Sequence, residues 1–355
     1  MKLFDSLKGR SDINVAFIGG SLTEGAGASK RANRYSSLVT QYIAQQLPTA
    51  NVSEINAAIG GTTSMFGLFR LQKQVLDKAP DVLFIEYAVN DCGNESLLSY
   101  YEGLIRTSRR YYPNLPIVTL IAYCDGNYNA EGENAHGYKV TVKGQANIAK
   151  AYGVPVIYMG KPLYDKICEC GDMKKYITDT VHPNDLGYSV YFDEIKRVLP
   201  DAEFTFEFPQ QPVTGKDFIS PVMIPAEELT NAKGDFLLSK RVTTYGGNLR
   251  YFCADTKGQT LEIDFEGTVC AAYTRIEKDS GIANVYIDDN FVCEFNQWDT
   301  YANSFDRDSC AFFADNLEYG KHTLKFEVTG KKSPESEGHV IRVAALLTAN
   351  VVEYK

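Results

Sequence analysis

Short apolar runs alternate with longer amphipathic segments over the first 200 residues, and this alternation restricts the possible folds more than any other feature. Runs that are almost continuously apolar are typical of strands that are buried on both faces of a sheet. They lie at residues 15–20, 81–89, 116–123 and 154–159, and a further strand is expected at 51–56. Segments with a helical period occupy 35–47, 66–79, 97–112, 138–152 and 186–199. This repetition predicts an α/β domain over residues 1–200, with helices on both faces of a parallel sheet.

The pattern changes after residue 200. Residues 207–225 contain four prolines and no helical period, so we expect a linker at 201–225. Beyond it, polar and apolar residues alternate with a period of two, in runs at 260–267, 283–295, 322–330 and 339–349. Many short strands separated by turn residues predict an antiparallel β-sandwich over residues 226–355.

The charge and hydropathy of the chain disfavour several classes of partner. The net charge is −9, so a basic surface for nucleic acid is not expected, and an acidic surface also disfavours anionic membranes. No apolar stretch is long enough to span a bilayer, and the first residues lack the apolar centre of an export signal. We therefore expect a cytoplasmic protein with no nucleic-acid or membrane partner. Its eight scattered cysteines are expected to be mostly buried free thiols, with disulfides only if the protein is exported.

The first apolar run ends in the sequence FIGGSLTEG, at residues 17–25, where a serine follows two glycines. A phosphate-binding loop would need a lysine where Ala26 stands, and a nucleophile elbow would need a second glycine where Thr23 stands. A dinucleotide-binding fingerprint cannot be fitted to these glycines either. The role of Ser21 must therefore depend on residues elsewhere in the chain.

Polar residues follow the ends of several predicted strands, where open parallel sheets place their active sites. Singly, these residues have ordinary explanations, because glycines relax turns, asparagines cap helices, and loops carry solvated Asp and His side chains. Together, they supply a nucleophile, a base, a carboxylate that orients the base, and donors for an oxyanion. The set consists of Ser21, Gly60–Gly61, Asn90–Asp91, and Asp179 with His182.

This set resembles the four sequence blocks of the SGNH hydrolases, also called the GDSL esterase family, in order and spacing over residues 14–199. The blocks read GGSLTEG, NAAIGGTTS, YAVNDCG and DTVHPN. The chain departs from the family at Gly20, where the family usually has an aspartate before the serine. That aspartate is not one of the catalytic groups, so the resemblance still implies an active hydrolase with a flavodoxin-like three-layer α/β/α domain.

The resemblance also implies a role for each residue. Ser21 is expected to be the nucleophile, His182 the general base, and Asp179 the carboxylate that orients the imidazole. The expected oxyanion donors are the backbone N–H groups of Ser21 and Gly61 and the side-chain amide of Asn90. No metal or organic cofactor is implied.

The second half resembles galactose-binding-type jelly-roll modules, which often accompany carbohydrate-active enzymes. Its polar loop at 296–309 holds the only tryptophan, Trp298, which is either a core residue or a contact for a sugar ring. His136 lies in another polar loop, at 125–138, and is a second candidate for contact with substrate.

An SGNH domain followed by a sandwich resembles microbial carbohydrate esterases, in particular acetyl-mannan esterases. This resemblance implies a carboxylic ester hydrolase that removes acetyl groups from hemicellulose-derived oligosaccharides, such as manno- or xylo-oligosaccharides. The first half is equally compatible with an acyl-thioesterase or a lysophospholipase, although the sequence shows no apolar lid. A non-catalytic glycan-binding protein is a third alternative, which the presence of all four catalytic positions disfavours. The expected partner is an acetylated oligosaccharide, and the sequence is also compatible with a homo-oligomer.

Overall fold

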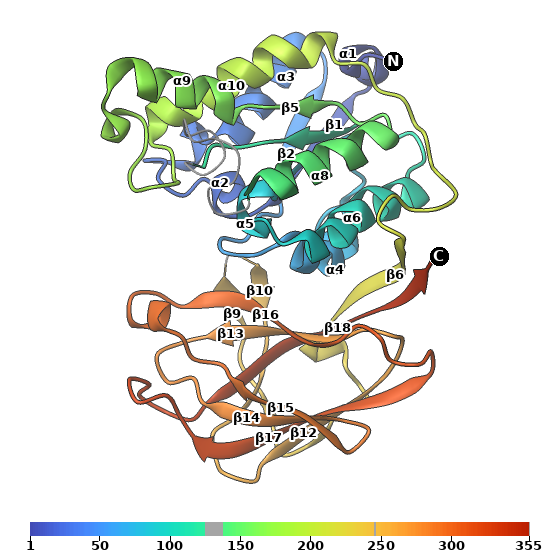
Figure 1. Ribbon diagram of the computed structural model, residues 1–355, viewed down its shortest axis with the longest axis vertical. Coiled ribbons are helices and arrows are strands. Elements are labelled where there is room, and N and C mark those ends of the chain that lie inside the picture. The colour runs from blue at the N-terminus through green and yellow to red at the C-terminus, as the bar shows by residue number, and fades with distance from the viewer. Residues whose placement is uncertain (125–137, 245, 355) are drawn as a thin grey trace. The chain divides into compact units, whose positions relative to one another are not determined.

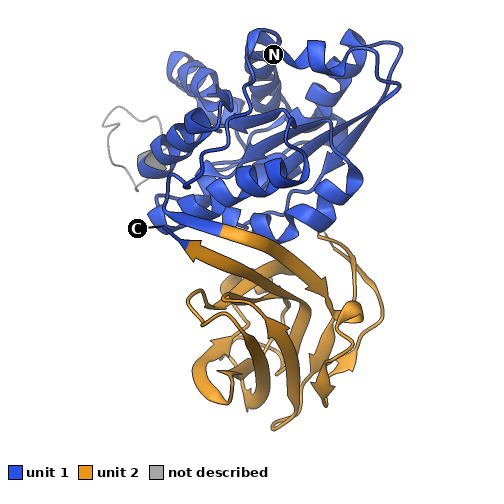
Figure 2. Cartoon of the chain, turned by 90° about the vertical axis from the view of Figure 1, so that its right-hand side faces the viewer, with its two compact units in different colours: residues 1–217, 353–355 blue, residues 218–352 orange. Residues whose placement is uncertain are grey.

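The structure is a computed structural model, which describes residues 1–124, 138–244 and 246–354. The chain forms two compact units (Figure 2). The first contains residues 1–217 and 353–355, and the second contains residues 218–352. The predicted classes of both halves are confirmed, because a parallel α/β sheet is followed by two antiparallel sheets.

A five-stranded parallel sheet forms the centre of the first unit, in the order β2-β1-β3-β4-β5. The strands are β1 (Asp12–Gly19), β2 (Asn51–Asn56), β3 (Val82–Glu86), β4 (Ile117–Leu120) and β5 (Val156–Ile157). This order is flavodoxin-like, and the direction in which strands are added reverses beside β1. Ligands of such sheets bind at the carboxyl ends of the strands next to this reversal.

Helices cover both faces of the sheet (Figure 1). On one face, α10 (Asp185–Val198) packs against α3 (Tyr35–Gln46) and α9 (Gly160–Cys170). On the other, α6 (Leu98–Tyr111) packs against α4 (Ser64–Gln74) and α8 (Tyr138–Ala151). Four of the described α-helices were not predicted, and they are α9 and the three short helices α1 (Leu3–Leu7), α2 (Ser21–Glu24) and α5 (Ala88–Asp91). Because a helix of four or five residues contains little more than one turn, it leaves no period in the sequence.

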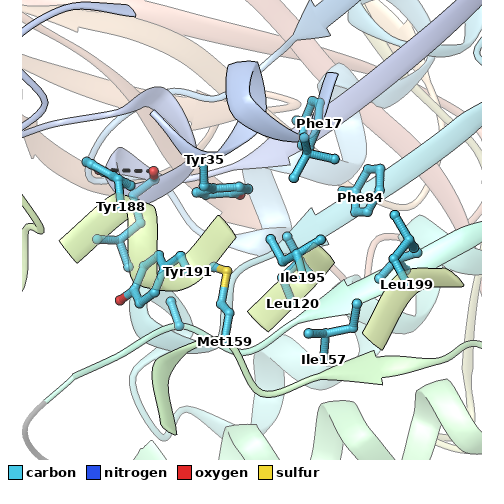
Figure 3. Close-up of a cluster of buried hydrophobic side chains, with 14 of the residues drawn as sticks. Phe17, Tyr35, Phe84, Leu120, Ile157, Met159, Tyr188, Tyr191, Ile195 and Leu199 are labelled. Carbon is cyan, nitrogen blue, oxygen red and sulfur yellow. Dashed lines mark hydrogen bonds between the residues drawn. The ribbon is translucent and has the colours of Figure 1, made fainter. Parts of the chain in front are cut away.

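An aromatic core lies between the sheet and the first of these helical layers (Figure 3). Phe17 of β1 and Phe84 of β3 stack with their ring centroids 4.8 Å apart. Tyr35 of α3 contacts Phe17 on one side and Tyr188 and Tyr191 of α10 on the other. This core holds the start of α10 close to the carboxyl end of β1.

The second unit is a β-sandwich with an apolar core between its sheets. One sheet has the order β16-β13-β18-β11-β8, with β6 also pairing with β18, and the other has the order β15-β14-β17-β12-β7. A separate hairpin joins β9 (Val242–Thr244) and β10 (Gly247–Leu249). The sheet strands are β6 (Lys216–Pro225), β7 (Lys233–Gly234), β8 (Leu237–Leu238), β11 (Phe252–Ala254), β12 (Thr260–Glu266), β13 (Cys270–Ile276), β14 (Ile282–Ile287), β15 (Asn290–Asn296), β16 (Arg307–Ala314), β17 (Lys321–Lys331) and β18 (Ile341–Glu353).

The predicted strand at 283–295 is in fact a hairpin of β14 and β15. Its turn residues Asp288 and Asp289 both have positive φ, 51° and 61°. When both central residues have positive φ, the turn has a twist that suits a two-residue hairpin. Asp tolerates this backbone conformation better than most residues. The alternation is in fact interrupted at the turn, where three polar residues, Asp288 to Asn290, stand in a row.

The segment expected to be a linker, 201–225, is divided between the two units. Its second part begins β6, and its first part is bound by buried side chains of α6. The Glu102 carboxylate accepts the N–H groups of Val213 and Thr214, at 2.6 and 2.8 Å. Arg106 donates to both oxygens of Asp217, at 2.9 and 2.8 Å. The sequence does not indicate this packing, because the segment has several prolines and no helical period. Its backbone N–H groups are bound by side chains of a helix that is distant in the sequence.

Most of the cysteines are not buried, so that prediction is wrong. Only Cys124 and Cys270 are fully buried, and the described structure contains no disulfide between cysteines. Cys168 and Cys170 are exposed in the last turn of α9, where Glu169 lies between them and Gly171 follows. Within the described residues, no helix combines the length and apolar character that a membrane span requires.

Candidate active site

The carboxyl ends of three adjacent strands bring the predicted site residues toward one edge of the sheet. Ser21 begins α2 directly after β1, and Asn90 lies in α5 directly after β3. Gly60 and Gly61 follow β2. Because the strand order is β2-β1-β3, the serine stands between the two groups expected to donate to an oxyanion.

Ser21, His182 and Asp179 form a continuous hydrogen-bonded chain. The distance from Ser21 Oγ to His182 Nε2 is 2.8 Å, and the distance from His182 Nδ1 to Asp179 Oδ2 is 2.6 Å. The other carboxylate oxygen, Oδ1, accepts the backbone N–H groups of Val181 and His182, both at 2.8 Å. Aspartate three residues before histidine thus closes its own turn and still reaches the imidazole. The geometry is that of a nucleophile, a base and an orienting carboxylate.

The Asp179 carboxyl is ionised over the ordinary pH range. Partial burial acts to raise its pKa, but hydrogen bonds from the His182 side chain and from the backbone N–H groups of His182 and Val181 lower the pKa to about 2. An ionised carboxylate can only accept, so it takes the Nδ1–H of the imidazole. Nε2 is then free of hydrogen and can accept the Ser21 hydroxyl proton.

Hydrogen bonds of α10 hold the segments that carry His182 and Ser21 in place. The Asn184 side chain caps α10 by accepting the N–H groups of Leu186 and Gly187, which fixes the loop that carries His182. From α10, the Tyr188 hydroxyl donates to the carbonyl oxygen of Ala26, at 2.8 Å, just after the helix of Ser21. The histidine loop and the serine helix are therefore joined through α10.

The loop after β2 is tied to the serine helix by two residues that the sequence analysis did not select. Glu24, at the end of α2, accepts the Gly60 N–H at 2.7 Å. Asn56 accepts the Ala58 N–H and donates to the Thr23 carbonyl oxygen. A Cβ placed on Gly60 would lie 3.5 Å from the Ser21 Cβ, so this loop contacts the serine directly. Gly61 follows with φ of +70°, a conformation that favours glycine. Both missed residues lie inside the quoted blocks, but nothing in their spacing indicates their contacts.

Asn90 lies against the residue that precedes the serine. A Cβ placed on Gly20 would lie only 1.9 Å from Asn90 Oδ1, so the close approach requires glycine here. The side chain of Asn90 is thereby held beside the start of α2. This contact explains why glycine, and no larger residue, precedes Ser21 in this chain.

The model of the GDSL-like Lipase/Acylhydrolase family matches residues 17–190, which include Ser21, Asn90 and the Asp179–His182 turn. The N-terminal part of the chain belongs to this GDSL-like hydrolase family. No curated protein matches the sequence.

Two solved structures share the fold of the GDSL-like hydrolase and its sandwich together. One is a two-domain esterase (CEX) active on acetylated mannans, with a TM-score of 0.82 and 21% sequence identity, covering 99% of this chain and 94% of that chain. The other is a two-domain esterase (CEX) active on acetylated mannans, co-crystallised with mannopentaose. Its TM-score is 0.82 and its sequence identity 22%, and the match covers 99% of this chain and 93% of that chain. An acetylxylan esterase, Axe2 from Geobacillus stearothermophilus, has a TM-score of 0.43 and 17% identity, covering 56% of this chain and 97% of that chain.

Substituting Gly20→Asp in the GDSL-like domain, which introduces the residue that the SGNH family usually has, is expected to lower kcat at least about tenfold. The new Cβ would displace the Asn90 amide, and a displacement of about 1 Å can cost a hundredfold in rate. The measurement is kcat on an aryl acetate, with folding checked by circular dichroism. Gly320→Asp is the control, since a Cβ there meets no atom within 4 Å and its backbone does not have the positive φ that favours glycine. Activity of Gly20→Asp at or above the wild-type rate would contradict the steric explanation.

Two further residues were expected to contact substrate. His136 lies outside the described residues. Trp298 is 8% exposed and packs with Ile276 and Ala302 in a small core cluster of the second unit. Little of its ring is exposed, which is typical of a packing role, and the contact of Trp298 with a glycan stays a prediction. The sequence alone left both roles open, because the number of tryptophans does not indicate their burial.

Proposed function

We propose that this chain is a serine esterase that removes O-acetyl groups from carbohydrate through an acyl-enzyme on Ser21. The observation that carries the proposal is the chain of hydrogen bonds from Ser21 Oγ through His182 to the Asp179 carboxylate. This arrangement activates a hydroxyl that is a weak nucleophile on its own.

In the proposed acylation step, Ser21 Oγ attacks the acetyl carbonyl carbon while His182 Nε2 takes the hydroxyl proton. The carbonyl oxygen becomes an oxyanion, which the N–H groups of Ser21 and Gly61 and the Asn90 amide stabilise. One such donor contributes about 3–4 kcal/mol to the transition state. The bond from the acetyl carbon to the sugar oxygen then breaks, and the sugar hydroxyl leaves with the proton from His182.

Deacylation repeats the same steps with water as the nucleophile. The oxygen of the water attacks the acetyl carbon of the Ser21 ester while His182 Nε2 takes a proton from the water. The bond to Ser21 Oγ breaks, the proton returns to the serine, and acetate leaves. Asp179 stays ionised throughout and stabilises the imidazolium.

Two observations support a carbohydrate ester as the substrate. The two-unit fold is shared over nearly the whole chain with an esterase active on acetylated mannans. The polar loop of the second unit, residues 296–309, also exposes two aromatic rings. Tyr301 and Phe305 are 62% and 54% exposed, with ring centroids 6.2 Å apart. Aromatic faces of this kind bind the apolar faces of sugars, and they are better placed to do so than the buried Trp298.

Acetate release tests the reaction and the acyl preference together. Wild-type protein is expected to release acetate from acetylated manno-oligosaccharides, and its kcat/KM on aryl esters is expected to fall from acetyl to octanoyl. The measurements are acetate assays on acetylated mannan, xylan and pectin fragments, beside a series of aryl esters, with Ser21→Ala as the blank. A higher kcat/KM on octanoyl than on acetyl esters would instead favour a lysophospholipase or thioesterase.

The loop at 296–309 is tested by comparing two substitutions. Tyr301→Ala is expected to lower kcat/KM on an acetylated oligosaccharide at least about fivefold and to leave an aryl acetate unchanged, because the small ester has no sugar ring for Tyr301 to bind. Trp298→Ala is expected to destabilise the fold by about 3–5 kcal/mol, as loss of a buried aromatic ring commonly does. The measurements are kinetics and thermal unfolding. Equal losses of Tyr301→Ala on both substrates would exclude a role of this ring in glycan binding.

A further inference from the structure

A buried carboxylate that has no part in the steps above lies among the segments expected to supply the oxyanion donors. Asp91 ends α5 directly after Asn90, and its side chain is 1% exposed. Its Oδ1 accepts the backbone N–H of Ser64 at 2.9 Å, and its Oδ2 accepts the side-chain amide of Gln145 at 3.0 Å. Both partners are fully buried. Each oxygen of this carboxylate therefore binds a separate segment of the chain.

The partner of Oδ1 adjoins the loop that carries Gly61, residues 57–63. Ser64 follows this loop as the first residue of α4, where the N–H groups have no acceptor within the helix. The N-cap residue, Thr63, makes no side-chain hydrogen bond to the helix, and Asp91 satisfies one of these N–H groups instead. A negative group is also favoured at this end of a helix. The hydrogen bond thus joins the Gly61 loop to the short helix of Asn90.

A second carboxylate binds the Gly61 loop from the opposite direction. Glu24, on the helix of Ser21, accepts the Gly60 N–H at 2.7 Å. Gly61 therefore lies between two N–H groups that are bound by carboxylates, one from α2 and one from α5. These two hydrogen bonds fix the loop relative to both the serine helix and the helix of Asn90.

The partner of Oδ2 belongs to α8, a helix without a proposed site residue. The carbonyl oxygen of the Gln145 amide, Oε1, is buried with no hydrogen-bond partner among the described residues. The hydrogen bond to Asp91 is therefore the one that fixes the orientation of this amide in the described structure. If residue 91 became a donor, the amide could rotate and offer its oxygen instead. The two links of Asp91, to the Gly61 loop and to α8, can for this reason be separated by substitution.

We propose that Asp91 is a positioning residue, which holds the Gly61 loop beside Asn90 so that the two donors act on one oxyanion. This role rests on the proposed function, since it concerns the donors for the tetrahedral intermediate. Displaced donors stabilise the transition state less, while the uncharged ester in the ground state is bound as before, so their displacement lowers kcat and leaves KM nearly unchanged. The link to α8 contributes to the fold and not to the alignment of the donors.

Three substitutions separate the two links in kinetics on an aryl acetate. Asp91→Leu keeps the branching of the side chain but has no acceptor, so kcat is expected to fall at least about thirtyfold, with KM within about threefold. Asp91→Asn can still accept the Ser64 N–H and can donate to a rotated Gln145 amide, so its kcat is expected within about threefold of wild type. Gln145→Met is the matched control, which removes only the link to α8, and the same limit is expected. Burial raises the pKa of Asp91 to about 7, against hydrogen bonds from Ser64 and Gln145, so kinetics at pH 8.5 keep it ionised.

A transition-state analogue distinguishes positioning from a general loss of structure. The boron of phenylboronic acid bonds to Ser21 Oγ as the serine proton passes to His182, and the negative tetrahedral adduct offers an oxygen to the oxyanion donors. Its inhibition constant is expected to rise in Asp91→Leu by about the factor by which kcat falls, and to stay unchanged in Asp91→Asn and Gln145→Met. The proposal is overturned if that constant is unchanged in Asp91→Leu, if folded Asp91→Leu keeps kcat within threefold, if Gln145→Met loses as much, or if Asp91→Asn loses more than tenfold.

Amide hydrogen exchange tests the link to the Gly61 loop without catalysis. Exchange at residues 57–64, followed by mass spectrometry, is expected to be at least about tenfold faster in Asp91→Leu and unchanged in Gln145→Met. If Asp91→Leu does not fold, Asp91→Ser takes its place, because its shorter side chain does not reach the Ser64 N–H. Unchanged exchange at residues 57–64 in a folded Asp91 variant would overturn the link, even if the wild-type protein proved inactive on every ester. A failure of this inference is thereby distinguished from a failure of the proposed reaction.

Discussion

Ser21→Ala and His182→Ala are each expected to lower kcat on an aryl acetate by at least about a thousandfold, with no loss of folded structure. Alanine at position 21 removes the atom that would form the acyl-enzyme, and alanine at position 182 removes the acceptor 2.8 Å from that atom. Residues that act as one unit give similar losses when removed singly, and the rate that remains comes from the oxyanion donors and substrate binding. The measurement is steady-state kinetics with thermal unfolding of each variant.

A matched control comes from α10 itself. Among the described residues, Ser189 donates only to the Leu186 carbonyl oxygen of its own helix, so Ser189→Ala removes a serine hydroxyl without changing the hydrogen bonds of Ser21, His182 and Asp179. Its kcat is expected within about twofold of wild type. A loss of less than tenfold in folded Ser21→Ala would show that another residue is the nucleophile, and the proposed reaction would then be wrong.

Asp179→Asn is expected to lower kcat by about a hundredfold to ten-thousandfold while the protein stays folded. The asparagine amide can donate to Nδ1, which places the imidazole proton on Nε2, where it can no longer accept from Ser21. The pKa of Asp179 is lowered to about 2, so its carboxylate is present at every pH above about 4 and the loss should persist across that range. The measurement is kcat between pH 5 and pH 9.

Asp165→Asn serves as the control, because Asp165 is an exposed carboxylate that pairs only with Lys161 in the described structure. It is expected to have no effect beyond twofold. If Asp179→Asn recovered wild-type activity at high pH, the carboxylate would contribute charge alone and not the choice of tautomer.

The sequence predicted the catalytic chain more completely than the groups that support it. Asp179 and His182 are three residues apart, and the turn that joins them is closed by backbone N–H groups of the same segment. Hydrogen bonds between residues so close in the sequence can be predicted from a short motif. The contacts of Glu24 and Asp91 join residues 36 and 27 positions away, so only the folded chain brings them together.

The second unit was less predictable for a related reason. β13 (Cys270–Ile276) is buried at every residue, so it lacks the alternation that identified its neighbours. Several other strands have only two or three residues, which is too short for any period to appear. The sandwich class could still be predicted, because the longer strands β12 and β17 keep one face inward and β12 pairs with β17 along its full length.

The hydrogen bonds from α6 to residues 205–217 determine where the chain can be cut to separate the two units. Cutting the chain at residue 200, the boundary that the sequence suggests, would remove the partners that residues 205–217 supply to Glu102, Arg106 and Arg109, although their contacts with Tyr152 would stay. Removing one partner of a buried ion pair typically costs about 3–5 kcal/mol. The chain leaves the first unit after Asp217 and returns at Glu353, and there the Tyr354 N–H donates to the Gly215 carbonyl oxygen at 2.8 Å. The segments at 215–217 and 353–354 therefore lie side by side, so the sandwich is inserted into the first unit at two neighbouring positions. Excising residues 218–352 and closing the gap with a short bridge would remove a whole module without opening the core of the hydrolase.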